Sequence, residues 1–169
     1  MTNYLVKRRE QTRAILSVFN GESNEKTREE ILKTLITNIG DKCFITPNFF
    51  CEYGMNIELG DNVYFNANCV LLDCAQIKIG SNTMIVPNVQ LYTPEHPLDY
   101  KSRNNGLEWA KPITIGDNCW LGGSVIVLAG VTIGSGCVIG AGAVVTKDIP
   151  DNSLAVGNPA KIIRTINND

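Results

Sequence analysis

The chain has 169 residues, of which 19% are charged and 44% are hydrophobic, and its formal net charge is −2 at pH 7. This length suits one domain with a small extension, and the charge excludes a whole-chain basic field that would attract nucleic acid. No apolar run approaches the roughly 18 residues that a membrane span requires, and the first residues lack the apolar stretch of a signal peptide. We therefore expect a cytoplasmic protein without nucleic-acid or membrane partners.

The first 38 residues have helical periodicity. Apolar residues recur at three- and four-residue spacing within 8–20 and 25–38, with charged residues between them, and Asn20-Gly21 separates the two stretches. We predict a short N-terminal helical segment, assigned to residues 1–40, which carries no catalytic constellation.

From about residue 57 the chain changes to a period of six. A large aliphatic or aromatic residue recurs at Leu59, Phe65, Leu71, Ile79, Ile85, Leu91, Ile115, Leu121, Val127, Ile133, Ile139 and Val145. Three residues after each one stands a turn former or small residue in nearly every row, so each unit supplies a short strand and a turn. Because one unit cannot bury its inner face alone, the units must stack.

A regular six-residue period is typical of a parallel β-helix, and a run of unrelated strands would not keep these columns. We assign residues 41–169 to this mainly β solenoid, and twelve rows at three per coil predict about four coils. The repeat stops after Pro94 and resumes in phase at Ile113, which leaves an excursion loop at 95–112. Long loops on rigid scaffolds are common sites of chemistry.

The only histidine of the chain, His96, lies at the start of this loop between Pro94 and Pro97. Histidine titrates near neutral pH and is the commonest general base, and the prolines restrict the backbone around it. Asp99 and Glu108 lie in the same loop, and either carboxylate can orient the imidazole and stabilise its charged form. The sequence leaves the choice between them open.

The six cysteines have no metal-site spacing, because none forms a C-x-x-C pair and no histidine accompanies them. We expect reduced thiols that pack as small apolar residues, and we predict no metal. A zinc hydrase would need several histidines, which this chain does not have.

Four segments carry a family resemblance: YTPEHP, KPITIGDNCWLGG, VIVLAGVTIGSGCVIGAGAVVTKDIP and AVGNPAKIIR. They resemble the hexapeptide-repeat acyltransferases, most closely the maltose, galactoside and nodulation-factor O-acetyltransferases, and the resemblance runs from about Arg8 to Ile166. It implies a left-handed parallel β-helix, acetyl-CoA as the acetyl donor, and a homotrimer with active sites between neighbouring subunits.

The resemblance also implies roles for single residues. It places the catalytic histidine on His96, an asparagine near the acceptor on Asn66, and a carboxylate beside the histidine on Glu108. It implies CoA contacts at Trp120, Gly123, Ala141, Thr146, Lys147, Lys161 and Arg164, the last of them in a C-terminal tail on the CoA side. Small residues permit close approach of a pantetheine arm, and cations suit its phosphates.

The acceptor side departs from the family pattern. Glu52 stands where similar sugar enzymes carry serine or aspartate, and Cys74 follows Asp73 where the galactoside type has a second aspartate. We predict that Glu52, Asn66 and Asp73 bind the acceptor, which we expect to be a maltose-, glucose- or galactoside-like sugar.

The predicted reaction is a direct transfer. His96 removes the proton from a sugar hydroxyl as that oxygen attacks the thioester, a backbone N–H near Gly123 stabilises the oxyanion, and His96 then protonates the CoA thiolate. The alternatives are N-acetyl transfer to an amino sugar, a nucleotide sugar or serine, and a scaffold without catalysis.

Overall fold

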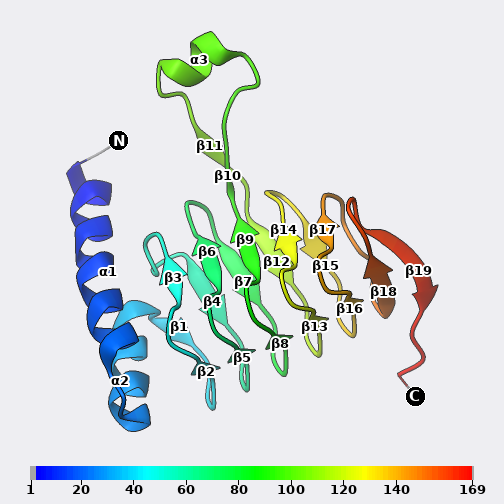
Figure 1. Cartoon of the computed structure of the whole chain (residues 1–169), viewed down its shortest axis with the longest axis horizontal. Helices are drawn as coiled ribbons and strands as arrows, with labels where there is room; N and C mark the ends of the chain where they lie inside the picture. Colours follow the sequence, from blue (N-terminus) through cyan, green and yellow to red (C-terminus); the bar gives the residue numbers. More distant parts are fainter. Residues whose placement is uncertain (1–2, 169) are drawn as a thin grey trace.

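In this computed structural model, residues 3–168 are described, and two N-terminal helices lead into a long three-sided solenoid (Figure 1). Met1, Thr2 and Asp169, which the two predicted segments include, lie outside the described residues. Within 3–168, no helix combines the length and the hydrophobicity that crossing a bilayer requires.

The predicted N-terminal helices are present as α1 (Asn3–Gly21) and α2 (Glu25–Leu35), but β1 (Asn38–Ile39) already begins the solenoid inside the range 1–40 assigned to them. Asn24 caps α2, because its side chain accepts a hydrogen bond of 3.1 Å from the Thr27 N–H. The buried faces of the two helices pack onto the core of the solenoid through Leu16, Phe19, Leu32 and Leu35. The helices therefore close the N-terminal end of the solenoid.

The strands form three sheets, named A, B and C here in the order in which the chain visits them. Sheet A contains β1 (Asn38–Ile39), β4 (Ile57–Leu59), β7 (Ile77–Ile79), β12 (Ile113–Ile115) and β15 (Thr132–Ile133). Sheet B contains β2 (Phe44–Ile45), β5 (Tyr64–Phe65), β8 (Met84–Ile85), β13 (Trp120–Leu121), β16 (Val138–Ile139), β18 (Ser153–Val156) and β19 (Lys161–Thr165). Sheet C contains β3 (Phe50–Cys51), β6 (Val70–Leu72), β9 (Gln90–Tyr92), β14 (Ile126–Val127) and β17 (Val144–Val145).

Neighbouring strands of each sheet are parallel, except that β19 returns antiparallel to β18. In Figure 1 the strands of sheet C run upward on the near side while the chain advances from left to right, so the coil is left-handed, as predicted. The solenoid has about six turns, and the predicted count of about four is wrong. The first coil keeps the period of six at Ile39, Ile45 and Cys51, and two extra residues separate it from Leu59, as two also separate Leu71 from Ile79.

The columns of the repeat have the predicted roles. The large residues of the period lie inside and are buried. Five asparagines of the turn columns adopt the left-handed conformation, with φ between 56° and 63°, namely Asn62, Asn68, Asn82, Asn88 and Asn118. All six cysteines are free, and the thiol of Cys119 lies 3.1 Å from the Gly134 carbonyl of the next coil. Four of the cysteines lie in the core, whereas Cys43 and Cys74 are partly exposed.

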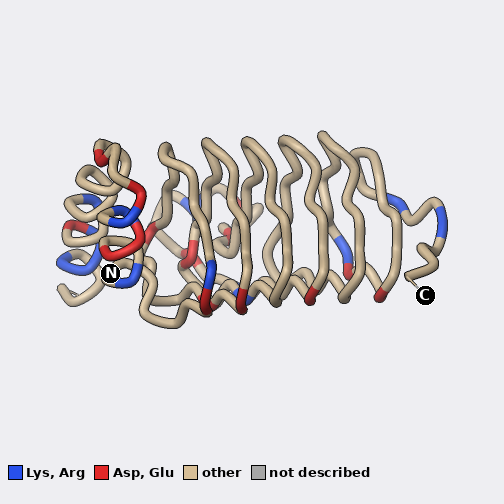
Figure 2. The backbone as a smooth tube through the Cα atoms, turned by 90° about the horizontal axis from the view of Figure 1, so that it is seen from below, with Lys and Arg blue, Asp and Glu red and all other residues tan. Residues whose placement is uncertain are grey.

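The outward columns differ between the three sheets. Sheet A presents polar residues, including an ion pair of 2.8 Å between Glu58 and Lys78. The outward column of sheet B is Phe44, Tyr64, Met84, Trp120, Val138 and Leu154. The outward column of sheet C is Phe50, Val70, Gln90, Ile126 and Val144. Figure 2 shows charged residues gathered on the two helices and sparse along the coils. The outward columns of sheets B and C are mostly apolar.

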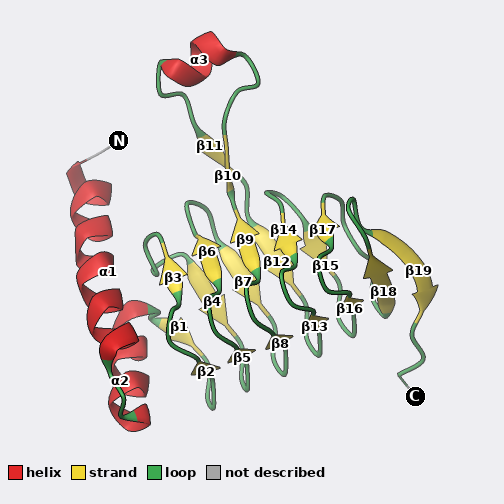
Figure 3. Cartoon of the chain, in the orientation of Figure 1, coloured by secondary structure: helices red, strands yellow, loops and turns green. Residues whose placement is uncertain are grey.

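The predicted excursion is an ordered arm, defined here as residues 94–110. β10 (Pro94–Glu95) pairs antiparallel with β11 (Trp109–Ala110), and the short helix α3 (Tyr100–Asn104) forms the tip that stands away from the coils (Figure 3). Asp99 caps α3, because its Oδ2 accepts a hydrogen bond of 2.8 Å from the Ser102 N–H.

Candidate active site

The predicted site residues lie at two corners of the solenoid. The BC corner, between sheets B and C, carries Asn66, Gly123 and Ala141. The CA corner, between sheets C and A, carries Glu52, Asp73, His96, Glu108, Thr146 and Lys147. Since every coil crosses sheet C from one corner to the other, the two groups lie on opposite edges of that sheet. Within residues 3–168 no hydrogen bond or ion pair joins Asn66 to His96.

His96 lies at the base of the arm between two hydrogen-bond acceptors. Its Nδ1 is 3.4 Å from the Leu107 carbonyl oxygen, and its Nε2 is 3.4 Å from Glu108 Oε2. A carbonyl and a carboxylate only accept, so each contact is attractive when the ring nitrogen that faces it carries a proton, and the neutral ring satisfies one of the two. The side chains of His96 and Glu108 are 50% and 41% exposed, so both are open to a substrate.

The structure distinguishes the two carboxylates that the sequence leaves open. Glu108 contacts the imidazole, whereas Asp99 is occupied as the cap of α3. Glu95 braces the base of the arm, because its Oε2 accepts hydrogen bonds from Trp109 Nε1 at 2.7 Å and Lys111 Nζ at 2.8 Å. The hydrogen bond from Lys111, and then that from Trp109, lowers the pKa of Glu95.

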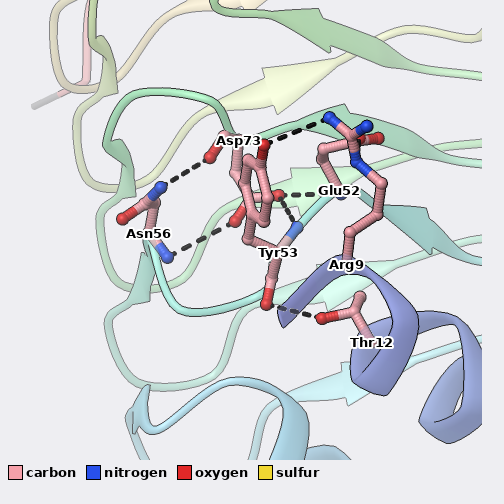
Figure 4. Close-up of polar contacts among 6 residues, drawn as sticks. All are labelled: Arg9, Thr12, Glu52, Tyr53, Asn56 and Asp73. Atoms are coloured by element: carbon pink, nitrogen blue, oxygen red, sulfur yellow. Dashed lines mark hydrogen bonds and ion pairs between the residues drawn. The ribbon is translucent and has the colours of Figure 1, made fainter. Parts of the chain in front are cut away.

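Asp73 is fully buried beneath the turn at residues 52–56 (Figure 4). Its Oδ1 accepts hydrogen bonds of 2.8 Å from the N–H groups of Glu52 and Tyr53, and its Oδ2 accepts one of 3.3 Å from Asn56. Burial raises the pKa of Asp73 to about 6, and these N–H groups oppose the rise. Because the carboxylate has no exposed surface, it holds this turn in place instead of making the predicted direct contact with an acceptor.

A cavity of about 350 Å³ lies between the base of the arm and the N-terminal helix α1. It is lined by Leu5, Tyr53, Cys74, Gly106, Glu108, Trp109 and Ala110. The indole of Trp109 is 43% exposed and offers an aromatic wall beside the Glu108 carboxylate. A second cavity of about 300 Å³ between α2 and β2 is remote from His96, and it includes none of the predicted site residues.

The BC corner is built from backbone and small side chains. Gly123 and Ala141 occupy the same row of successive coils, and the Gly142 N–H donates to the Gly123 carbonyl at 2.8 Å. The Gly123 N–H has no hydrogen-bond partner within residues 3–168. Asn66 is half-buried at this corner two coils away, where its Oδ1 accepts from the Ala67 N–H at 2.8 Å. The corner thus offers a free donor beside a shallow, small-residue surface.

The remaining predicted CoA residues divide between sheet B and the far corner. Trp120, Val138, Leu154 and Arg164 are successive cross-strand partners on the outside of sheet B, where Trp120 is 48% exposed. Lys161 pairs with Val156 on the same edge. Thr146 and Lys147 are exposed at the CA corner after β17, on the other side of sheet C. One chain therefore does not gather all seven residues at one place.

Sequence reasoning missed Arg9, Thr12 and Tyr53, which join α1 to the turn at 52–56. Thr12 is fully buried and donates a hydrogen bond of 2.8 Å to the Tyr53 carbonyl. Its position before Leu16 and Phe19 on the buried face of α1 was the available signal, since a polar residue in an apolar stripe needs a buried partner. Among residues 3–168, no group of three His, Cys, Asp or Glu side chains is placed to hold a metal ion.

Known proteins resemble this chain over nearly its whole length. Residues 112–147 match the family described as hexapeptide repeat of succinyl-transferase. A Saccharomyces cerevisiae protein that is provisionally named an acetyltransferase is 46% identical over 164 residues, which are 96% of this chain and 84% of that protein.

Solved structures agree with this assignment. The maltose O-acetyltransferase from Clostridium difficile 630 has a TM-score of 0.95 and 46% identity, covering 98% of this chain and 90% of that one. A galactoside acetyltransferase in complex with coenzyme A has a TM-score of 0.96 and 40% identity, covering 99% of this chain and 84% of that one. Identity of this extent along nearly the whole of both chains shows that the protein belongs to the hexapeptide-repeat acyltransferases, in the subgroup of the maltose and galactoside O-acetyltransferases.

Proposed function

We propose that this protein transfers an acetyl group from acetyl-CoA to a hydroxyl of a sugar, with His96 as the general base. The observation that carries the proposal is the placement of His96 between the Leu107 carbonyl and Glu108 at the base of the arm. A proton on Nδ1 satisfies the Leu107 carbonyl and leaves Nε2 as the base. When Nε2 takes up the substrate proton, both ring nitrogens face acceptors, which stabilises the imidazolium.

The reaction follows from this arrangement. Nε2 accepts the proton of the sugar hydroxyl while the sugar oxygen forms a bond to the thioester carbonyl carbon, which becomes a tetrahedral oxyanion. The unpartnered Gly123 N–H is the donor that we assign to that oxyanion. The carbon–sulfur bond then breaks, and the imidazolium returns its proton to the CoA thiolate, so that the acetyl ester and free CoA leave.

We place the donor along the BC corner. Gly123 and Ala141 allow close approach of the pantetheine arm, Trp120 offers an exposed aromatic surface, and Lys161 and Arg164 supply positive charge for phosphates. The similarity to a galactoside acetyltransferase that was solved with coenzyme A supports this assignment. Thr146 and Lys147 complete the donor site from the CA corner of a second subunit.

We propose that the active form is a homotrimer in which the BC corner of one subunit meets the CA corner of the next. Two observations support it. The donor residues and His96 lie on opposite edges of sheet C, and the outward column of sheet C is half-buried and mostly apolar even within one chain. A symmetric assembly around that face brings the two half-sites together at each subunit boundary.

Thiol release from acetyl-CoA tests the proposed reaction. The purified protein is assayed with maltose, glucose, a galactoside, glucosamine and serine, and we expect release with neutral sugars. His96→Ala is expected to lower kcat by about 10²- to 10⁴-fold, with CoA affinity measured by calorimetry nearly unchanged. Release of thiol with amines alone would indicate N-acetyl transfer. Full activity of the His96→Ala variant would refute the role of His96 as the general base.

Mixed subunits test the shared site. His96→Ala and Asn66→Ala chains are each expected to be inactive, whereas co-expressed chains should regain up to about a quarter of the wild-type activity, because a quarter of the boundaries join an intact His96 to an intact Asn66. Mass spectrometry of the assembly confirms that the two chains mix. Mixed assemblies that stay inactive would contradict a site shared between subunits.

A further inference from the structure

The outer face of sheet C carries polar side chains in the middle of a mostly apolar surface. Among the described residues of its outward column, Gln90 is the only polar one. Gln90 and Tyr92 are the two outward residues of β9, and both side chains are half-buried within a single chain. β9 is the central strand of the sheet, with β6 on one side and β14 on the other (Figure 1).

The coils on both sides of β9 present aliphatic side chains to the same face. Val70 of the coil before and Ile126 of the coil after lie beside Gln90. Leu72 of the coil before lies beside Tyr92. A molecule that packs on this face therefore meets apolar surface one coil above and one coil below the polar pair.

The Gln90 amide is only partly satisfied within its own chain. Its Oε1 accepts a hydrogen bond from the Tyr92 hydroxyl, whereas its Nε2 has no partner within residues 3–168. A side-chain amide has two N–H donors and an oxygen that accepts two hydrogen bonds. Gln90 thus keeps both donors and one acceptor position for a group outside the chain.

A face made of stacked coils does not by itself fix the level at which two copies pack. Neighbouring strands are about 4.8 Å apart, and apolar contacts are not directional, so two such faces pack almost as well after a shift by one coil. In a closed trimer the three subunits lie at the same level. A shift by one coil at each boundary leaves the ring open and produces a helical assembly instead.

We propose that Gln90 and Tyr92 form a polar layer that fixes the level at which three copies of this chain meet. The inference rests on the proposed function, because it takes sheet C as the face where the subunits of the proposed trimer meet. At equal levels the three Gln90 amides face one another by symmetry, so that Nε2 of one copy donates to Oε1 of the next. After a shift by one coil, each amide would face Val70 or Ile126 of its neighbour and would be buried without an acceptor.

Such a layer has a recognisable signature, because it raises specificity and lowers stability. One polar residue in the apolar seam of a coiled coil fixes the register and the number of chains at a cost in stability. Apolar residues that replace buried polar groups are often as stable or more stable. An apolar residue at position 90 should therefore give assemblies that resist heat better but are less uniform.

Gln90→Leu tests this signature. Gln76→Leu is the matched control, because it makes the same exchange at an exposed position before β7, where the Gln76 amide donates to Glu58 at 3.2 Å. Light scattering after size-exclusion chromatography at several protein concentrations, together with native mass spectrometry, counts the subunits, and calorimetry gives the melting temperature. For Gln90→Leu the ratio of closed trimers to larger assemblies should fall by about five- to a hundredfold while the melting temperature rises, and the control should match wild type.

Gln90→Glu tests whether the three side chains meet. It brings three negative charges together at the centre of the trimer, so the dissociation constant of the trimer at pH 7 should rise by at least about tenfold, and less in high salt. Gln76→Glu should leave that constant unchanged. Analytical ultracentrifugation measures both variants.

Two results would overturn this inference alone. One is a Gln90→Leu protein that is uniformly trimeric, whether its melting temperature rises or falls. The other is a Gln90→Glu trimer that is as tight as the wild type. A wild-type chain that does not form a trimer would overturn the proposed assembly together with this inference, and sedimentation of the wild type reports that before any variant is made.

Discussion

The BC and CA corners of the same solenoid are built in different ways. At the BC corner, Gly123 and Ala141 are consecutive rows of one column, held by the ladder of sheets B and C. At the CA corner, the turns at 52–56 and 73–76, the arm and α1 are all departures from the repeat. The part of the proposed donor site at the BC corner is therefore formed by the regular repeat. The acceptor side is formed by irregular segments, which can vary in sequence without disturbing the coils.

The largest difference in kcat is expected between variants of two carboxylates in the arm, Glu108 and Asp99. Glu108→Gln should lower kcat by about tenfold or more, because the imidazolium loses its nearest negative charge, while Asp99→Asn should leave kcat near wild type, since asparagine caps a helix as well as aspartate. Steady-state kinetics with a saturating sugar measures both. Equal losses in the two variants would mean that the arm acts through its fold and not through the contact of Glu108 with His96.

Adjacent glycines test how rigid the BC corner is. A Cβ on Gly122 would lie 2.5 Å from the Ala141 nitrogen, whereas on Gly123 its nearest neighbour would be 3.6 Å away. We expect Gly122→Ala to destabilise the protein by about 1–3 kcal/mol and Gly123→Ala to change stability by less than about 1 kcal/mol. Calorimetric unfolding compares the two. A well-tolerated Gly122→Ala would show that this corner is less constrained than its ladder implies.

Asp73 gives the CA corner a dependence on pH. Burial raises its pKa to about 6, so between about pH 4 and 6 the folded protein holds a proton that the unfolded chain has lost. Its contribution to stability should therefore fall as pH rises through that window. The difference in melting temperature between wild type and Asp73→Asn should narrow from pH 4 to pH 7. A difference that widens would mean that the three N–H groups outweigh burial.

The smallest effect on kcat is expected at Glu95, which holds the base of the arm through Trp109 and Lys111. Glu95→Gln keeps an acceptor for Trp109 but loses the charge that pairs with Lys111, so kcat should fall by only about two- to threefold. Glu58→Gln, which breaks an exposed pair on sheet A, should leave kcat unchanged. If both variants behave like wild type, the antiparallel ladder of β10 and β11 positions His96 without help from the brace.

The repeat made most of the fold predictable. The period of six identified the inward residues and the turn column, and its interruption located the arm, because backbone geometry repeats wherever the columns repeat. The first coil was missed although Ile39, Ile45 and Cys51 also recur at six residues, and the two extra residues before Leu59 are matched by two before Ile79. The period carries no information on handedness, which came from the family resemblance.

A candidate site could be proposed from the sequence where residues suited to catalysis are rare. His96 is the only histidine of the chain, so it was the only histidine available as a general base. Of the two carboxylates that the sequence left open as its partner, Glu108 contacts it in the structure. The role of Asp73 could not be predicted from the sequence. Neither the residue type nor the flanking residues distinguish an aspartate that binds backbone N–H groups from one that binds a sugar. Arg9 could not be found either, since its partners are more than 40 residues away along the chain.

The two helices that close the first coil also hinder end-to-end association with other copies of the protein. A stack of parallel coils ends in strands whose N–H and C=O groups point along the axis, and another solenoid could dock there end to end. At one end α1 and α2 cover β1, β2 and β3 with Leu16, Phe19, Leu32 and Leu35, and at the other β19 reverses direction against β18. These two different closures oppose end-to-end growth of the solenoid into a fibre.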